Sequence, residues 1–150
     1  MTNQELQARV EAISMSVFHQ PFNHQAVFNA RLRTTGGRFY PATMNLDFNP
    51  KIFAIYPSDV TDGIIKHELV HYHLFAQHRG YQHRDHDFKQ LLAAVGGSRF
   101  APPLPMSGRH YVYQCTRCGR QFVRRRRINV TRYACGVCRG KLRLQATRNN

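Results

Sequence analysis

The feature that most constrains this chain is the pentapeptide His67-Glu68-Leu69-Val70-His71, which lies within an apolar run. On a helix, residues four positions apart lie on one face, one turn apart, so both imidazoles can bind one Zn²⁺. Glu68 is rotated by about 100° from His67 and can reach an attacking water rather than the metal. A carboxylate there can take a proton from that water and later pass it to a leaving amine. The alternative is a core helix that carries these residues by chance.

A catalytic zinc site takes three protein ligands and leaves one position for water, so two histidines are not enough. Two candidates for the third ligand, His83 and His86, lie beyond Gly80, where the helix should stop. The chain can turn back toward the helix there, and spacing does not choose between them. Asp85 and Asp87 could accept a hydrogen bond from a ligand imidazole, or could cap the next helix.

The remaining segments of the first hundred residues predict an α+β scaffold with a small antiparallel sheet. An amphipathic helix is expected over residues 4–18, and the helix of the pentapeptide should end near residue 78. Gly36-Gly37 is expected to form a hairpin turn. Short strands are predicted over residues 26–32, 38–40 and 43–48.

Four cysteines fall into two Cys-x2-Cys pairs, Cys115, Cys118, Cys135 and Cys138. The sixteen residues between the pairs are within the range of a four-cysteine zinc site. Gly119 and Gly136 lie where the turns of such a site need positive φ or a close backbone approach. We therefore expect a structural zinc ribbon, too small to fold without its metal. Redox-active thiols are the alternative.

The formal charge of +14 lies entirely in the last part of the chain. Residues 1–87 contain eight Lys/Arg and eight Asp/Glu, whereas residues 88–150 contain fourteen Lys/Arg and no acid. Such a field favours a polyanionic partner, nucleic acid ahead of a membrane surface. A basic tail kept for solubility is the alternative. We expect phosphate contacts from the sharpest basic run, Arg124, Arg125, Arg126 and Arg127, and expect the nearby aromatic residues to cover the core of the ribbon.

A proline-rich segment, residues 101–108, is expected to link a first domain of residues 1–100 to the ribbon of residues 109–148. No stretch approaches the ~18 consecutive apolar residues of a membrane span. The N-terminal residues lack the basic and apolar regions of a secretory signal. We therefore expect a cytoplasmic protein without a membrane partner, in which paired cysteines hold metal rather than form disulfides.

Five segments together carry a resemblance to a known family: His67–Leu74, Gly80–Asp85, Asp87–Lys89, Arg31–Arg38 and Val95–Phe100. They resemble the SprT-like family of zinc metalloproteins, whose eukaryotic relatives include the Spartan-type DNA–protein crosslink proteases. In that family the third histidine lies in the segment that matches residues 81–85, so the resemblance favours His83.

The resulting prediction is an HExxH zincin-like metallopeptidase domain joined to a zinc ribbon, with one catalytic and one structural Zn²⁺. His67, His71 and His83 would hold the catalytic ion, Glu68 would be the general base, and the ribbon would bind nucleic acid, with DNA favoured. The Spartan resemblance implies protein substrates attached to DNA. Two alternatives stay open. One is a non-catalytic nucleic-acid-associated adaptor, for example in transcription, whose first zinc site is closed by both His83 and His86. The other is a hydrolase that acts on a different bond.

Overall fold

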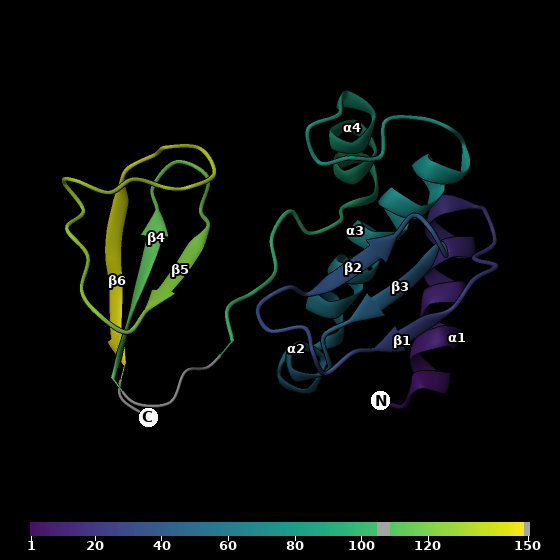
Figure 1. Ribbon diagram of the computed structural model, residues 1–150, viewed down its shortest axis with the longest axis horizontal. Coiled ribbons are helices and arrows are strands. Elements are labelled where there is room, and N and C mark those ends of the chain that lie inside the picture. Colours follow the sequence, from purple (N-terminus) through teal and green to yellow (C-terminus); the bar gives the residue numbers. More distant parts are fainter. Residues whose placement is uncertain (105–108, 149–150) are drawn as a thin grey trace. The chain divides into compact units, whose positions relative to one another are not determined.

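The computed structural model describes residues 1–104 and 109–148 and has a mixed α+β architecture (Figure 1). The chain separates into two units, Met1–Ala101 and Pro102–Asn150, each with its own three-stranded sheet. This confirms the predicted α+β class. The expected linker, residues 101–108, falls partly outside the description, because residues 105–108 are not among the described residues.

The sheet of the first unit is mixed, with strand order β1-β3-β2. Its strands are β1 (Ala26–Phe28), β2 (Gly37–Tyr40) and β3 (Asn45–Phe48). The central strand β3 pairs in parallel with β1 and antiparallel with β2, so the predicted antiparallel sheet is wrong in one of its two pairings. Gly36-Gly37 is not a hairpin turn either, because Gly37 begins β2 and β1 is not its neighbour. The hairpin lies between β2 and β3, where Met44 adopts a φ of 59°.

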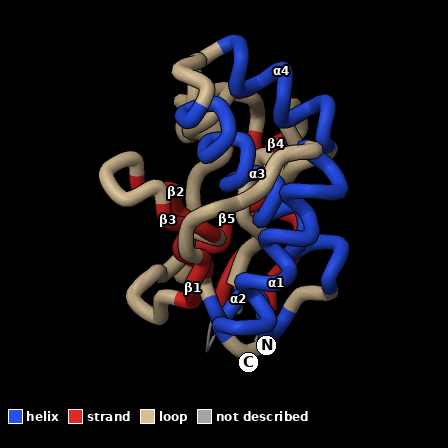
Figure 2. Tube along the Cα trace, turned by 90° about the vertical axis from the view of Figure 1, so that its right-hand side faces the viewer, coloured by secondary structure: helices blue, strands red, loops and turns tan. Residues whose placement is uncertain are grey.

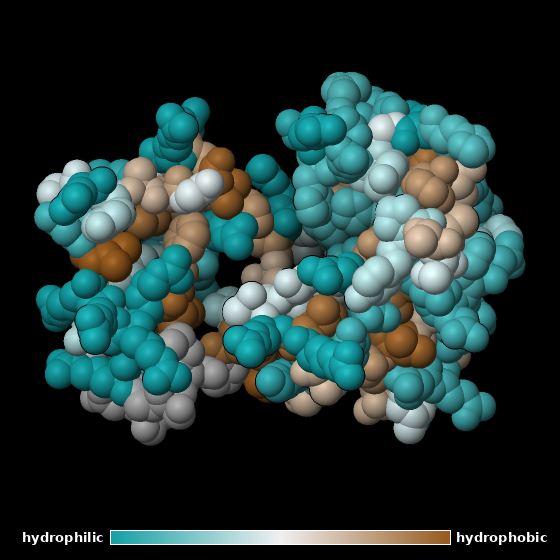
Figure 3. Space-filling view, viewed as in Figure 1, coloured by the Kyte–Doolittle hydropathy of each residue, from teal (hydrophilic) through white to brown (hydrophobic). Residues whose placement is uncertain are grey.

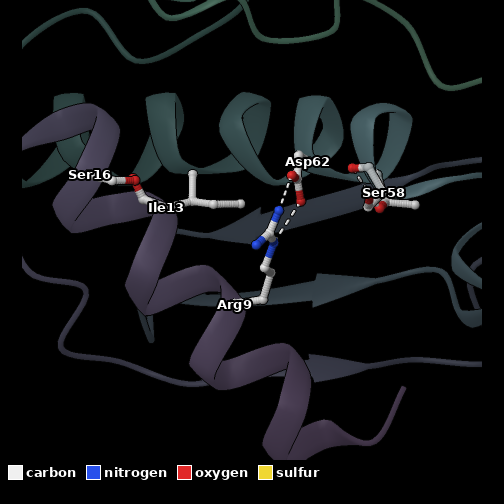
Figure 4. Close-up of polar contacts among 6 residues, drawn as sticks. Arg9, Ile13, Ser16, Ser58 and Asp62 are labelled. Atoms are coloured by element: carbon white, nitrogen blue, oxygen red, sulfur yellow. Dashed lines mark hydrogen bonds and ion pairs between the residues drawn. The ribbon is translucent and has the colours of Figure 1, made fainter.

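The first helix, α1 (Asn3–Ile13), begins with a capping box in which Thr2 and Glu5 exchange side-chain-to-backbone hydrogen bonds. It continues into a π-helical turn, η1 (Ser14–Phe18), so the helix predicted over residues 4–18 is present with a widened last turn. An ion pair between Arg9 and Asp62 connects α1 to the central helix (Figure 4).

The central helix α3 (Ser58–Ala76) follows the short helix α2 (Pro50–Ile55) and is largely buried. Helices α1 and α3 pack against the strands of the first sheet (Figure 2). Ile65 and Leu69 of α3 are fully buried. Helix α4 (His86–Val95) packs along α3 through a cluster formed by Val70, Leu74, Phe88 and Leu92.

The second unit is an antiparallel sheet of order β5-β4-β6. Its strands are β4 (His110–Cys115), β5 (Gln121–Arg124) and β6 (Leu142–Arg148). Cys115, Cys135 and Leu142 form its buried cluster, and Phe122 and Ile128 pack against that cluster. The cysteines are thus part of the core itself, as expected of a unit too small to bury a large apolar core.

Candidate metal sites

Three histidines of the first unit converge on one point. His67 and His71 lie one turn apart on α3, and His83 comes from the loop between α3 and α4. The Nε2 atom of His83 is 3.0 Å from Nε2 of His67 and 3.1 Å from Nε2 of His71. Nitrogen ligands around one zinc ion, each at about 2.0 Å from it, come similarly close to one another. The group thus has the geometry of a metal site.

Backbone carbonyls accept hydrogen bonds from the imidazoles of His67 and His71 on the side of each ring that faces away from the cluster. His67 donates through Nδ1 to the carbonyl of Ser98 at 2.6 Å, and His71 donates through Nδ1 to the carbonyl of Tyr81 at 2.5 Å. Because a carbonyl only accepts, Nδ1 carries the proton in both rings and Nε2 is left bare toward the cluster. This is the tautomer that a metal ligand requires.

Of the two roles expected for Asp85 and Asp87, the hydrogen bond from a ligand imidazole is wrong. Asp85 is at the N-cap position of α4, and its carboxylate accepts from the backbone N–H of Gln82. Asp87 accepts from the backbone N–H of Gly80 and pairs with Arg79. Both carboxylates therefore shape the loop that carries His83 instead of contacting an imidazole.

His86 does not join the cluster. It is the first residue of α4 and is exposed, whereas the loop presents His83 to the two histidines of α3. The turn that achieves this begins after His78, which adopts a φ of 56°. Sequence spacing left both histidines possible because it does not specify the path of the chain after the helix ends.

Aromatic rings pack against the histidines of the cluster and shield His67 and His71 partly from solvent. The ring of Phe88 lies 4.4 Å from the His71 ring and 5.2 Å from the His67 ring, measured between centroids. Phe39 of β2 lies parallel to the His71 ring at 6.3 Å. Burial lowers the pKa of His67 and of His71 to about 4. Both imidazoles are therefore neutral at physiological pH, as metal ligands must be.

Glu68 is buried on the side of α3 that faces β2. A Cβ atom added to Gly37 would lie only 2.8 Å from Cγ of Glu68, so a glycine in β2 makes room for this side chain. Burial raises the pKa of Glu68 to about 8, against a lowering effect of the positive charge of Arg38. A carboxyl group with a pKa near neutrality can both accept and donate a proton.

The four cysteines form the second cluster. Sγ of Cys115 is 3.4 Å from Sγ of Cys138, and Sγ of Cys118 is 3.7 Å from Sγ of Cys135. Sγ of Cys115 accepts hydrogen bonds from the backbone N–H groups of Arg117 and Cys118. These donors, with that of Cys118 first, lower the pKa of Cys115 to about 6, which favours the thiolate that binds metal.

The role expected for Gly119 in the turns around the cysteines is confirmed, whereas the role expected for Gly136 is wrong. Gly119 has the predicted positive φ, 78°, but Gly136 has neither a positive φ nor a close neighbour. The close approach is at Gly140, where an added Cβ would lie 2.8 Å from Sγ of Cys115. The sequence does mark this position, because Gly140 lies two residues after Cys138, the last cysteine of the second pair.

The basic run lies at the end of β5 and in the loop that follows, and its outer members contact aromatic rings. The guanidinium of Arg124 lies 5.5 Å from the ring centroid of Phe122, and that of Arg127 lies 5.4 Å from that of Tyr111. Arg125 and Arg126 are exposed. Figure 3 shows hydrophilic side chains and apolar surface side by side on this unit. The four arginines are thus on one solvent-facing segment.

The aromatic residues near the basic run have two different positions. Tyr113 is buried, in line with the expectation of a covering role, whereas Tyr133 is 53% exposed. A pocket of about 310 Å³ lies beside them. It is lined by Phe122, Arg124, Ile128, Tyr133, Ala134, Gly136 and Leu142. The ribbon therefore carries an apolar depression with a basic side chain in its wall.

Comparison with known proteins agrees with these two clusters. Residues 6–110 match the SprT-like family, and residues 109–145 match the SprT-like zinc ribbon domain. The chain belongs to the SprT-like family. No solved structure matches it.

Several relatives named "Protein SprT-like" match nearly the whole length of this chain. The relative from Lactiplantibacillus plantarum is 54% identical over 147 residues, covering 96% of this chain and 99% of that protein. The one from Enterococcus faecalis is 53% identical, with 97% of each chain covered. That from Lactococcus lactis is 50% identical, with 99% of each chain covered. No described helix is long and apolar enough to cross a membrane.

Sequence reasoning missed the groups that support the two histidines and the glutamate. The carbonyls of Ser98 and Tyr81 are backbone atoms and have no side-chain signature. The sequence pattern predicts a turn at Gly37, and it gives no sign that Phe88 lies against the imidazoles. Gly37 and Gly97 were the signal, because each lies close to α3.

A third histidine of α3, His73, is buried but lies outside the cluster. Its Nε2 is 2.8 Å from Oγ of Ser14, whose hydroxyl donates to the carbonyl of Gln20 at 2.6 Å. Ser14 must therefore accept from His73, so Nε2 of that ring carries a proton. Burial lowers the pKa of His73 to about 4.

We expect His73→Gln, which keeps a donor near the position of Nε2, to reduce the acid sensitivity of the fold. The folded pKa of His73 lies below the value of about 6.5 in the unfolded chain, so its contribution to stability is present above pH 6.5 and lost as the pH falls toward 4. Between pH 7 and 4 the unfolding free energy of the wild type should fall by roughly 3 kcal/mol more than that of the variant. Urea titrations across this pH range measure the difference. Equal pH slopes would contradict the neutral assignment.

Proposed function

We propose that this protein is a zinc-dependent peptidase of the HExxH zincin type that acts on DNA-associated proteins. The observation that carries the proposal is the convergence of three imidazoles, two of them with Nε2 left bare by an Nδ1 hydrogen bond, next to the buried carboxyl group of Glu68. His67, His71 and His83 would hold the ion. Three neutral imidazoles within reach of one point are a donor set that suits Zn²⁺. Zinc in such a site supplies Lewis-acid chemistry and lowers the pKa of water.

Glu68 would move the protons of the reaction. Its burial favours the neutral carboxyl group, while a nearby positive charge favours the carboxylate, so both forms are accessible near neutral pH. As a carboxylate it takes the proton from the attacking water, and as a carboxylic acid it returns that proton to the departing amine. Phe39 and Phe88 limit the access of bulk water to the imidazoles.

The number of side chains in the cluster favours a peptidase over an adaptor. Within residues 1–104 and 109–148, the group contains the three histidines and no fourth His, Cys, Asp or Glu. A fourth position is then open to water or substrate, as catalytic zinc sites require. The exposed position of His86 outside the cluster speaks against a site closed by two loop histidines.

The ribbon would carry a structural zinc on four thiolates and bring the first unit to nucleic acid. Support comes from the excess of arginine and from the exposed run of four arginines. A pocket with Phe122 and Tyr133 in its lining could accept an unstacked base next to these phosphate contacts. Cysteines that ligate metal rather than form disulfides suit a cytoplasmic location.

Metal analysis tests the two sites. We expect two zinc ions per wild-type chain and one in His83→Ala, because the first site loses a ligand. His86→Ala is the matched control and should keep both ions. Cys115→Ser should lose the second ion and keep the first. Inductively coupled plasma mass spectrometry of dialysed protein measures the zinc content. One ion in the wild type, or a loss in His86→Ala instead of His83→Ala, would contradict the assignment.

Glu68→Gln tests the peptidase. The amide has nearly the same shape but cannot accept the proton, so cleavage of a protein crosslinked to DNA should slow by about 10²–10⁴-fold. Zinc content should stay unchanged, which separates catalysis from metal binding. Glu11→Gln on α1 is the control and should cleave at the wild-type rate. If Glu68→Gln remains fully active, Glu68 is not the base. If the wild type binds DNA and zinc but cleaves nothing, the adaptor function gains support.

Replacing Arg124, Arg125, Arg126 and Arg127 with alanine tests the nucleic-acid interface. Each phosphate contact that is lost should flatten the slope of log Kobs against log[salt] by about 0.7–0.9. Fluorescence anisotropy with a labelled single strand and a labelled duplex, each at several salt concentrations, measures these slopes. Arg31→Ala/Arg33→Ala in the first unit is the control. Unchanged affinity and slope in the ribbon variant would indicate that the run is only solvated surface.

A further inference from the structure

The segment that follows α4 contacts His67 through a backbone carbonyl. Helix α4 ends at Gly96, which adopts a φ of 70°, and the chain then turns back onto α3. There Ser98 uses both of its backbone groups. Its N–H donates to the carbonyl of Gly63 at 3.0 Å, and its own carbonyl accepts from Nδ1 of His67 at 2.6 Å.

These two hydrogen bonds span one turn of α3. Gly63 lies four residues before His67, so the two residues share one face of the helix. Ser98 is therefore held to the helix by the turn that precedes the imidazole it contacts. These two hydrogen bonds therefore hold the Ser98 carbonyl against Nδ1 of His67.

Two glycines permit the segment to come this close. A Cβ atom added to Gly63 would lie 2.2 Å from Oγ and 3.4 Å from Cβ of Ser98. A Cβ atom added to Gly97 would lie 2.5 Å from Cδ1 of Leu92 and 3.4 Å from the backbone nitrogen of His67. A side chain at Gly63 would therefore collide with Ser98, and one at Gly97 would collide with Leu92 of α4 while it lies against α3. The φ of Gly63 and of Gly97 is not positive, so close approach is what requires glycine at both positions.

We propose that Ser98, docked through Gly63 and Gly97, is a positioning residue that fixes the tautomer and orientation of His67 for metal binding. The Ser98 carbonyl keeps the proton on Nδ1, which leaves Nε2 bare toward His71 and His83. The inference rests on the first zinc site of the proposed function but not on peptidase activity. Serine at this position acts through its backbone, and its hydroxyl is not needed.

Substitutions at Gly63 separate this role from general stability. Alanine and leucine are better helix formers than glycine, so neither should weaken α3 by itself. Gly63→Ala should displace Ser98 through its hydroxyl, and Ser98→Ala added to it should restore the wild-type state. Gly63→Leu extends past that hydroxyl to the backbone, and Ser98→Ala should not rescue it. Ser98→Ala alone is the control and should behave as the wild type.

The first measurement is zinc affinity at the first site of the full chain, with the ribbon already loaded. We expect Gly63→Leu to bind zinc about 10–100-fold more weakly than the wild type, as for lost supporting contacts of other metal ligands. Gly63→Ala should weaken binding in the same direction, and the double variant should recover it. Thermal melts of each variant check that the fold is retained.

The second measurement is the tautomer of His67, read from the ¹⁵N shifts of its ring while the first site is free of zinc. The wild type should carry the proton on Nδ1, and Gly63→Leu should be a mixture of both tautomers. A folded Gly63→Leu with wild-type zinc affinity and an unchanged tautomer would overturn the proposal. This readout needs neither zinc nor cleavage, so a failure of the proposed peptidase would be seen separately.

Discussion

The structure depends on the burial of several polar side chains on one helix. Helix α3 is the centre of the first unit, yet it carries His67, Glu68, His71 and His73 among its buried or half-buried residues. Burying so many titratable groups costs stability unless each is kept neutral or finds a partner. The surrounding elements supply those partners, and much of the fold around α3 can be understood from that requirement.

The partners of His67 and His71 are backbone carbonyls rather than carboxylates. A carbonyl accepts a hydrogen bond without adding a charge to a partly dry site, so the imidazoles stay neutral while their orientation is held. The aspartates nearby shape the loop that brings His83 to the cluster instead. The charged aspartates thus lie in the loop and do not contact the imidazoles. The carboxyl group next to the imidazoles is that of Glu68.

The ribbon solves a different physical problem. Its sheet is too small to bury a large apolar core, so the cysteine cluster takes the place of part of that core. Backbone N–H groups of both knuckles point at the sulfur atoms, which stabilises the thiolate form. The surface of this unit carries the run of arginines and the pocket beside it.

Much of the site could be predicted from local spacing. Two histidines four residues apart on a helix share a face wherever that helix packs, and two Cys-x2-Cys pairs form knuckles from local turns. The approximate helices and strands also followed from periodicity. These features need only short-range geometry, and they led to the family that the comparisons show.

Tertiary structure decided everything that depends on how distant segments meet. It placed His83 rather than His86 in the cluster, put β3 between β1 and β2, and moved the close glycine of the ribbon from Gly136 to Gly140. It also brought the carbonyls of Tyr81 and Ser98 to the imidazoles of His71 and His67. A backbone carbonyl is present in every residue, so its identity as a partner carries no mark in the sequence. The sequence by itself determined which side chains could bind metal, and the path of the chain between helices determined which of them meet.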